Sequence, residues 1–309
     1  MGTPEFAVAS LDALVRAEFN IVGVVTALDK PAGRGMKLSE SAVKKYAVEK
    51  SLPAGRQGLR ILQPEKLKNP SFLEELRSLH ADVQAVVAFR MLPEVVWNMP
   101  PLGTINVHAS LLPQYRGAAP INWTIINGEK ETGVTTFKLQ HEIDTGNILL
   151  QEKIKIGDNE TAGELHDRMK IIGAELLVKT IKGLMDGMVK EISQSESANP
   201  KFEILHHAPK IFTETCKIDW SKTVDEIYNL IRGLSPYPAA FTYLNNKILK
   251  IYHAKKEFEV NAFDNGSVHT DGKTFLKFAC SDGFIHVTDI QLEGKKRINV
   301  EDFLRGWRM

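Results

Sequence analysis

Cysteine is scarce in this sequence of 309 residues, which contains only Cys216 and Cys280. The two lie far apart and form no Cys-x-x-Cys pair, so the sequence supports neither a disulfide framework nor a cysteine-based zinc site. We expect both thiols to be free and unreactive, as in proteins of a reducing compartment.

Long hydrophobic runs are also missing. No apolar stretch approaches the roughly 20 residues that a membrane-spanning helix needs. Residues 1–20 carry Glu5, Asp12 and Glu18, where a secretory signal would be basic and then apolar. We therefore expect a cytoplasmic protein that has no membrane partner.

The sequence has no excess of charge of one sign. Its formal net charge of +1 excludes a polycation, so any binding of nucleic acid must come from local basic patches. With 43% hydrophobic and 25% charged residues, the composition is that of a globular protein. The length favours about two domains.

The histidines show no metal-ligand spacing. No His-Glu-x-x-His or comparable pattern occurs, and the adjacent pair His206 and His207 falls where we predict a connector between domains. We predict that the protein binds no metal.

Helical and strand-like patterns alternate over the first part of the chain, which predicts an α/β fold with an open, mostly parallel, Rossmann-like sheet. Apolar spacing predicts helices at residues 5–19, 40–51, 70–80, from about 118, and 161–185, and strands at 20–28, 82–89, 104–108 and 132–140.

The pattern changes after the polar run SQSESANP (193–200), which predicts a connector. Beyond it come one helix, at 223–233, and several short β-type segments separated by turns. We predict a first domain at 1–190, a linker at 191–205, and a small C-terminal antiparallel β-barrel, OB-like, at 206–309.

Two polar side chains end the predicted strand TINVH, Asn106 and His108. Residues two apart on a strand point to the same face, and ligand crevices lie at the carboxyl ends of strands in open α/β sheets. An amide beside an imidazole suits attack on a carbonyl, because the amide stabilises the oxyanion while the imidazole moves a proton. The alternative is a loop with a structurally hydrogen-bonded histidine.

A carboxylate, Asp144, follows the predicted strand at 132–140 in the sequence IDTGNILLQ. Aspartate before Thr-Gly is commonly an Asx-turn residue, which is the alternative here. An aspartic protease is excluded, because it needs two such carboxylates and the chain has one. The functional hypothesis is that Asp144 orients an imidazole from the neighbouring strand and holds it protonated.

Two further segments are candidates for binding. The loop DKPAGRGMKL (29–38), with Arg34 and Lys37, lacks the Gly-Lys-Ser/Thr ending of an ATP-binding loop. It is either a basic loop without a partner or one that reaches nucleic acid. The segment AFRMLP (88–93) predicts either a flat apolar wall for an aromatic ligand or plain core.

These motifs occur together with GTPEFA, TGVTTF and, in the second half, IDW followed by LSPYPAAFT. In this order and spacing, over nearly the whole chain, they resemble the methionyl-tRNA formyltransferase family of folate-dependent enzymes. The Asn-x-His pair and Asp-Thr-Gly are shared by all formyltransferases of this fold, whereas the PAGRG loop and the C-terminal domain point to initiator tRNA.

The resemblance implies formyl transfer from 10-formyltetrahydrofolate to the amino group of methionyl-initiator tRNA, for translation initiation, by a monomer that needs no metal. It assigns catalysis to Asn106, His108 and Asp144, and tRNA contact to Arg34 and Lys37. The folate site that it implies consists of Phe89, Arg90, Met91, Leu92, Ser110, Leu111, Leu112 and Pro113.

Other acceptors and a different class of function remain alternatives. The same core could formylate an amino sugar nucleotide or glycinamide ribonucleotide, or hydrolyse formylfolate. The glycinamide enzyme has a single domain, which residues 206–309 argue against. Intact Asn106, His108 and Asp144 argue against a catalytically inactive RNA-binding module.

The family resemblance also raises an expectation about the first residues. In the family an apolar strand leads into the turn GTPEF, and here Met1 stands where that strand would end. We expect a strand of roughly ten residues to be encoded upstream, which expression with and without the in-frame upstream codons would test.

Replacement of Arg34 by alanine should weaken the use of charged tRNA and leave folate binding unchanged, because a loop arginine contacts only the macromolecular substrate. If Arg34 meets a phosphate, the log-log salt dependence of tRNA binding should flatten by about one unit of slope. Titration of tRNA binding against salt measures this, and an unchanged slope would contradict the phosphate contact.

Overall fold

A computed structural model describes residues 1–32, 37–50, 59–197, 204–259 and 262–307. The chain divides into two compact units, which are described separately. The first comprises Met1–Arg116, Gly133–Ile154 and Asp167–His206, and the second comprises Gly117–Thr132, Lys155–His166 and His207–Met309.

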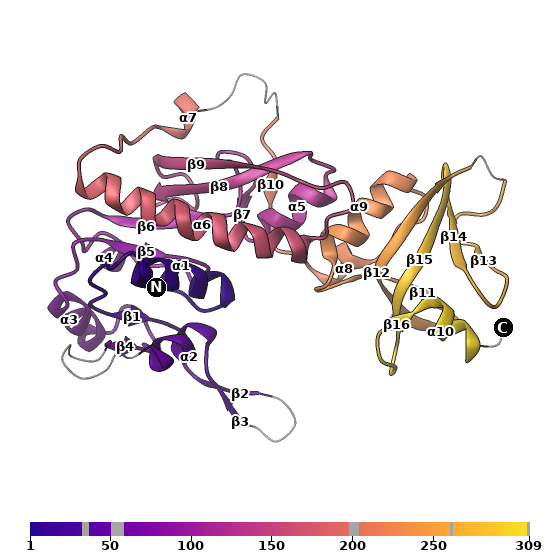
Figure 1. The fold of residues 1–309 in the computed structure, drawn as a ribbon, viewed down its shortest axis with the longest axis horizontal. Helices are drawn as coiled ribbons and strands as arrows, with labels where there is room; N and C mark the ends of the chain where they lie inside the picture. Colours follow the sequence, from indigo (N-terminus) through magenta and orange to yellow (C-terminus); the bar gives the residue numbers. More distant parts are fainter. Residues whose placement is uncertain (33–36, 51–58, 198–203, 260–261, 308–309) are drawn as a thin grey trace. The chain divides into compact units, whose positions relative to one another are not determined.

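The first unit is built on a sheet in the order β5-β6-β8-β9 (Figure 1). The strand bounds are β5 Gln84–Val86, β6 Thr104–His108, β8 Glu131–Lys138 and β9 Ile148–Lys155. A parallel pair, β1 (Val24–Val25) and β4 (Ile61–Leu62), is connected to β5 through the first residues of the chain. Gly2 donates its N–H to Val25 over 3.0 Å and forms a parallel bridge with Val87.

The strand β8 runs antiparallel to β6, with His108 opposite Thr135 and Ile105 opposite Lys138. The predicted α/β fold is confirmed, and the predicted mostly parallel sheet holds only in part: β1 and β4, and β5 and β6, pair parallel, whereas β6 and β8 pair antiparallel. The alternation of helices and strands along the chain indicates the fold class, but it does not state the direction in which a returning strand pairs. The direction matters because β8 ends beside the start of β6, at the opposite end from His108.

A long helix, α6 (Ala162–Met185), packs across this sheet (Figure 1). A β-carbon on Gly173 would lie 3.1 Å from Val107 of β6 and 3.3 Å from Val134 of β8, and glycine allows this close approach. Thr136 and Thr180 share a hydrogen bond of 2.7 Å. The other helices and strands with residues in this unit are α1 Glu5–Arg16, β2 Lys30–Ala32, β3 Lys37–Ser39, α2 Ala42–Glu49, α3 Pro70–Ser78, α4 Glu94–Trp97, β7 Arg116–Gly117 and α7 Gln194–Ser197.

The first residue of the chain lies inside this unit. The terminal ammonium of Met1 donates to the carbonyl of Ala85 over 2.6 Å, and burial lowers its pKa from 8.0 to about 5. An apolar cavity of about 160 Å³ adjoins Met1, lined among others by Leu11, Leu14 and Val83. The strand expected upstream of Met1 concerns residues outside this sequence and stays a prediction.

The second unit contains an antiparallel sheet in the order β11-β12-β15-β14-β13, with β16 paired to β15. The pairings among the described residues leave β11 and β13 at the two edges, so an OB-like barrel is not established by them. Strand bounds are β10 His207–Ala208, β11 Ala240–Leu244, β12 Lys247–Phe258, β13 Val268–Thr270, β14 Leu276–Cys280, β15 Gly283–Leu292 and β16 Ile298–Asn299. The helices are α5 Pro120–Ile126, α8 Thr213–Cys216, α9 Val224–Leu234 and α10 Val300–Arg305.

A single apolar core joins α9 to this sheet, with Ile227, Ile231, Phe278 and Ile285 almost fully buried in it. The capping box of Thr223 and Glu226 begins the helix by satisfying its first N–H groups. Both cysteines are buried and free, as predicted, and burial raises the pKa of each thiol. None of the helices in the described part of the chain is long and apolar enough to cross a lipid bilayer.

A charged cluster joins three strands of this sheet at Glu257. Burial favours the protonated carboxyl, but hydrogen bonds from Lys277, at 2.7 Å, and from His286 favour the carboxylate. Together they lower the pKa of Glu257 from 4.5 to about 2. Because the folded state binds this proton less tightly than the unfolded chain does, the carboxylate contributes stability above pH 4.5 that is lost as the pH falls toward 2.

Replacement of Glu257 by glutamine should therefore destabilise the protein more at pH 5.5 than at about pH 3, where the wild-type carboxyl loses its advantage. Urea unfolding of both proteins at the two pH values measures the difference. The control is Glu175→Gln, at an exposed carboxylate on α6. An equal loss of stability for Glu257→Gln at both pH values would contradict the assignment.

Candidate active site

The predicted pair Asn106 and His108 lies on β6, whose bounds match the prediction. His108 ends the strand with only 7% of its surface exposed, while Asn106 is half-buried. Because the strand is regular, both side chains project from the same face of the sheet. No described residue forms a hydrogen bond with the side-chain amide of Asn106.

The imidazole of His108 has a different neighbour at each ring nitrogen. Its Nε2 lies 2.9 Å from the carbonyl oxygen of Tyr115, which can only accept a hydrogen bond. The proton of the neutral ring is therefore assigned to Nε2. Its Nδ1 lies 3.8 Å from Oδ2 of Asp144, so a second proton on the ring would point toward this carboxylate.

Asp144 reaches His108 from a loop, at 139–147, that returns from the far end of β8. Its φ of 55° lies in the left-handed region, which non-glycine residues adopt only when their surroundings hold them there. Gly146 makes the return possible, because a β-carbon there would come within 1.7 Å of the carbonyl oxygen of Lys138. The sequence predicted the turn, and the glycine explains why the turn can fold back so closely.

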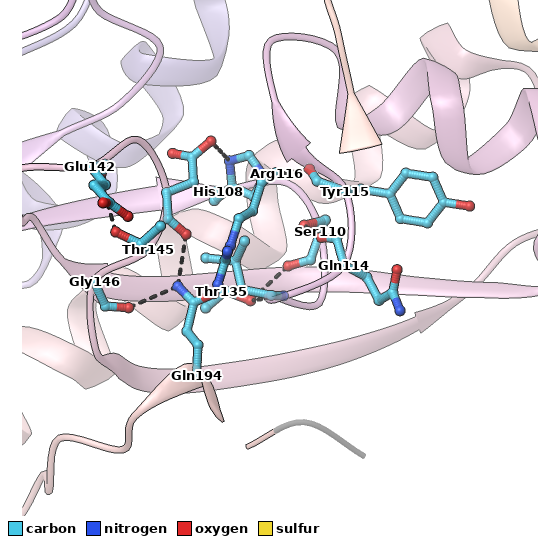
Figure 2. Close-up of polar contacts among 12 residues, drawn as sticks. His108, Ser110, Gln114, Tyr115, Arg116, Thr135, Glu142, Thr145, Gly146 and Gln194 are labelled. Carbon is cyan, nitrogen blue, oxygen red and sulfur yellow. Dashed lines mark hydrogen bonds and ion pairs between the residues drawn. The ribbon is translucent and has the colours of Figure 1, made fainter. Parts of the chain in front are cut away.

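Gln194 holds this loop from the outside (Figure 2). Its Nε2 donates to the carbonyl oxygens of Asp144 and Gly146, both over 2.8 Å. Its Oε1 accepts from Nε of Arg116 over 3.0 Å and from Nη2 over 2.6 Å. The side chain is only 4% exposed, so this buried amide has all of its hydrogen-bonding capacity satisfied.

The predicted folate segment Ser110–Pro113 is largely buried and forms the loop after β6. Thr135 of β8 donates to the carbonyl of Ser110 over 2.7 Å and accepts from the N–H of Leu112 over 3.1 Å. Ser110 donates to the carbonyl of Gln114 over 2.6 Å. Leu111 alone of the four side chains is half-buried, so Ser110, Leu112 and Pro113 shape the loop and could meet a ligand only through their backbone.

The predicted wall at residues 88–93 divides between core and surface. Leu92 is buried in the apolar core, which matches the alternative interpretation of this segment, whereas Met91 is 74% exposed. Phe89 is half-buried, and the guanidinium of Arg90 lies 5.6 Å from the centre of its ring. Arg90 also donates to the backbone carbonyls of Pro64 and Glu65.

The predicted tRNA contacts are only partly within the described residues. Arg34 lies outside them, and for Lys37 the structure describes only a backbone position in β3. His206, at the predicted connector, stacks on Tyr115 with ring centres 5.5 Å apart. The described residues contain no group of three or more His, Cys, Asp or Glu side chains suited to a metal ion.

Four residues at the site were not predicted from the sequence: Tyr115, Arg116, Thr135 and Gln194. Tyr115 acts through its backbone carbonyl, which no side-chain pattern reveals. Thr135 lies opposite His108 by strand register, and the register depends on the antiparallel pairing. Gln194 stands in the polar run that predicted a connector, and only its burial distinguishes it.

Two protein-family models match this chain, one over each of its two parts. The family model described as "Formyl transferase" matches residues 1–181. A second, "Formyl transferase, C-terminal domain", matches residues 210–308. Together the two models cover most of the chain.

Curated relatives match along the whole length. A protein from Parabacteroides distasonis named "Methionyl-tRNA formyltransferase" is 55% identical over 100% of this chain and 94% of its own length. A protein of the same name from Bacteroides thetaiotaomicron is 51% identical, over 100% of this chain and 95% of its own length.

Among solved structures, an N-formyltransferase from Helicobacter canadensis in complex with folinic acid and dTDP-3-aminofucose is similar in fold. The TM-score is 0.65, the identity is 22%, and the match covers 93% of this chain and 96% of that chain. At this identity the likeness shows a shared fold and leaves the acceptor of this chain open.

Proposed function

The chain belongs to the formyl transferase family, and on that premise we propose that it transfers the formyl group of 10-formyltetrahydrofolate to the amino group of methionyl-initiator tRNA. The product is the charged tRNA that starts translation. The observation that carries the chemistry is the group formed by Asn106, His108 and Asp144 at the end of β6. The observation that favours this acceptor is the similarity, above 50% over the whole chain, to two relatives that carry this name.

The reaction exchanges one C–N bond for another. The free amine of the methionyl group attacks the formyl carbon, and the carbonyl oxygen gains negative charge as the tetrahedral intermediate forms. The amide of Asn106 and the protonated imidazole of His108 stabilise this oxyanion. When the bond between the formyl carbon and the folate nitrogen breaks, the proton lost by the amine passes to that nitrogen.

Geometry supports separate roles for the two ring nitrogens of His108. The carbonyl of Tyr115 occupies Nε2, so Nδ1 is the nitrogen that remains for proton transfer. Asp144 lies 3.8 Å from Nδ1, which is longer than a hydrogen bond, so Nδ1–H can donate to a substrate oxygen or a water that comes between them. The carboxylate stabilises the imidazolium without taking its proton, as in other His–Asp pairs.

The folate would lie against the end of β6 and the segment after β5. Phe89 and Met91 offer apolar surface for the pterin ring, and the backbone of Ser110–Pro113 offers polar groups beside it. The hydroxyl of Thr135 fixes this backbone, because it donates to the carbonyl of Ser110 and accepts from the N–H of Leu112. A backbone held in this way can recognise a planar heterocycle with little loss of conformational entropy on binding.

The tRNA would be bound partly through the second unit. This unit carries cations beside exposed aromatic rings: the ammonium of Lys217 lies 5.8 Å from the ring centre of Tyr243, which is 52% exposed, and the ammonium of Lys256 lies 5.7 Å from that of Phe258. Phe258 is 62% exposed at the end of β12. Cations and exposed rings together suit a strand of nucleic acid, which offers phosphates and stacking faces.

Release of tetrahydrofolate should depend on the acceptor. With 10-formyltetrahydrofolate present, we expect rapid release with methionyl-tRNA and little with amino sugar nucleotides, glycinamide ribonucleotide or no acceptor. Absorbance or chromatographic assay of the folate measures the rate. Preference for a nucleotide-linked amine, or release without any acceptor, would contradict the proposed function.

Replacement of His108 by alanine should slow transfer by roughly 10² to 10⁴, the range for loss of a general acid or base. Asn106→Ala should slow it by about 10² to 10³, as for loss of an oxyanion donor. Tetrahydrofolate binding, measured by calorimetry, should persist in both variants. Near-normal turnover of His108→Ala at saturating substrates would show that the mechanism is wrong.

A further inference from the structure

We propose that Gln194 is a positioning residue that sets the place of Asp144 relative to His108, an inference that deepens the proposed function and rests on it. Gln194 lies outside the motifs that define the site in the sequence. It is nevertheless buried beside the loop that carries Asp144, and its amide makes four hydrogen bonds there.

The orientation of the Gln194 amide is fixed by its partners. A guanidinium can only donate, so the oxygen of the amide must face Arg116. The nitrogen must then face Asp144 and Gly146, whose carbonyls can only accept. Only one orientation of the amide satisfies these partners, and a flip of the amide would break all four hydrogen bonds.

The two carbonyls that Gln194 binds bracket the turn that presents Asp144. On the other side of the turn, Gly146 packs against the carbonyl of Lys138 so closely that no other residue would fit. The turn is thus confined between β8 and Gln194. This confinement explains how Asp144 keeps its left-handed backbone and holds its carboxylate 3.8 Å from Nδ1 of His108.

The oxygen of the Gln194 amide connects, through Arg116, to the backbone at the Nε2 side of His108. Arg116 directly follows Tyr115, whose carbonyl accepts from Nε2 of His108. Gln194 therefore connects the two backbone segments that hold the ring, one at each nitrogen (Figure 2). A change at Gln194 should alter the setting of Asp144 beside His108 without touching any substrate.

The chain segment that carries Gln194 is itself held along the same loop. Ile192 exchanges two backbone hydrogen bonds with Ile148 at the start of β9, of 2.8 and 2.9 Å. Glu191 accepts from Lys138 over 2.9 Å and from Asn147 over 3.0 Å, and these hydrogen bonds lower the pKa of its carboxyl. The pairing of Ile192 with Ile148 therefore extends the sheet by one residue pair and places Gln194 beside the turn.

Two variants separate the halves of the interaction. Gln194→Met keeps the length of the side chain and removes every hydrogen bond. Gln194→Glu keeps oxygens for Arg116, but an ionised carboxylate cannot donate to the carbonyls of Asp144 and Gly146. The matched control is Gln84→Met, because Gln84 is also buried in this unit but contacts Thr104, at the opposite end of β6 from His108.

Steady-state kinetics of the full-length chain with 10-formyltetrahydrofolate and methionyl-tRNA provide the first measurement. We expect both Gln194 variants to lower kcat by about 10²-fold, the loss that follows misplacement of a catalytic group by about 1 Å, with little change in either KM. The pH profile of kcat should change in the same variants. Gln84→Met should retain the kcat and the pH profile of the wild type, even if its thermal stability falls.

Combination with Asp144→Asn distinguishes positioning from a general structural effect. If Gln194 acts through Asp144, Gln194→Met should cause little further loss of kcat in the Asp144→Asn protein. A full multiplicative loss in that background would overturn the proposal. Wild-type kcat in Gln194→Glu would overturn it as well, because the donors to the turn would then be dispensable.

A measurement on the free protein keeps this inference separate from the proposed function. The ¹⁵N resonances of the His108 ring, assigned by their loss in His108→Ala, should shift in both Gln194 variants and not in Gln84→Met. If the wild type fails to formylate methionyl-tRNA while these shifts occur, the proposed function is wrong and the positioning role stands. Unchanged His108 resonances in both Gln194 variants would overturn the positioning role whatever the acceptor is.

Discussion

The imidazole of His108 has one neighbour at each ring nitrogen, and the rest of the site depends on holding both in place. Tyr115 offers its carbonyl to Nε2 at 2.9 Å, and Asp144 presents its carboxylate 3.8 Å from Nδ1. Both residues have left-handed backbones, with φ of 58° and 55°. A non-glycine residue in this conformation costs free energy, so each needs further contacts that determine its geometry.

Those further contacts come from the same part of the chain, the described residues between 191 and 206. Gln194 binds the Asp144 turn, and His206 accepts from the N–H of Tyr115 over 2.8 Å and donates its own N–H to Gln114. Gln114 also donates to the carbonyl of Ile204. Gln194 and Ile204, which the sequence assigned to a linker, and the adjacent His206 therefore hold the loops on both sides of His108.

The sequence predicted the strand that carries Asn106 and His108 better than the contacts around it. Alternation along a strand places Asn106 and His108 on one face, and the structure has the strand at the predicted residues. The position of Asp144 beside His108 followed only from its motif, because β8 pairs antiparallel to β6 and ends away from His108. Strand direction depends on pairings between distant residues, and neither periodicity nor turn composition encodes it.

Helices were predicted well for a similar physical reason. Amphipathic spacing and a capping residue are local signals, so α6 and α9 lie where the patterns placed them, at Ala162–Met185 and Val224–Leu234. The conformation of the loop at 139–147 does not follow from local signals. It depends on the close packing of Gly146 against Lys138 and on the hydrogen bond from Gln194. The part of the site that the sequence could not predict is the part built from contacts across the fold.

The chemistry of an amide explains why the sequence did not predict a role for Gln194 and why this side chain can bridge Arg116 and the Asp144 turn. A glutamine side chain offers two donors and two acceptor lone pairs without charge. Its hydrogen bonds can therefore be satisfied either by solvent or in a buried site where all four are used. Here an apolar residue would remove the hydrogen bonds to Arg116 and to two backbone carbonyls, and a carboxylate would face those carbonyls with no hydrogen to donate. The polar composition of the segment around Gln194 predicts only a solvated connector. The burial of this amide, with all of its hydrogen bonds made, indicates instead that the side chain fixes the geometry of its neighbours.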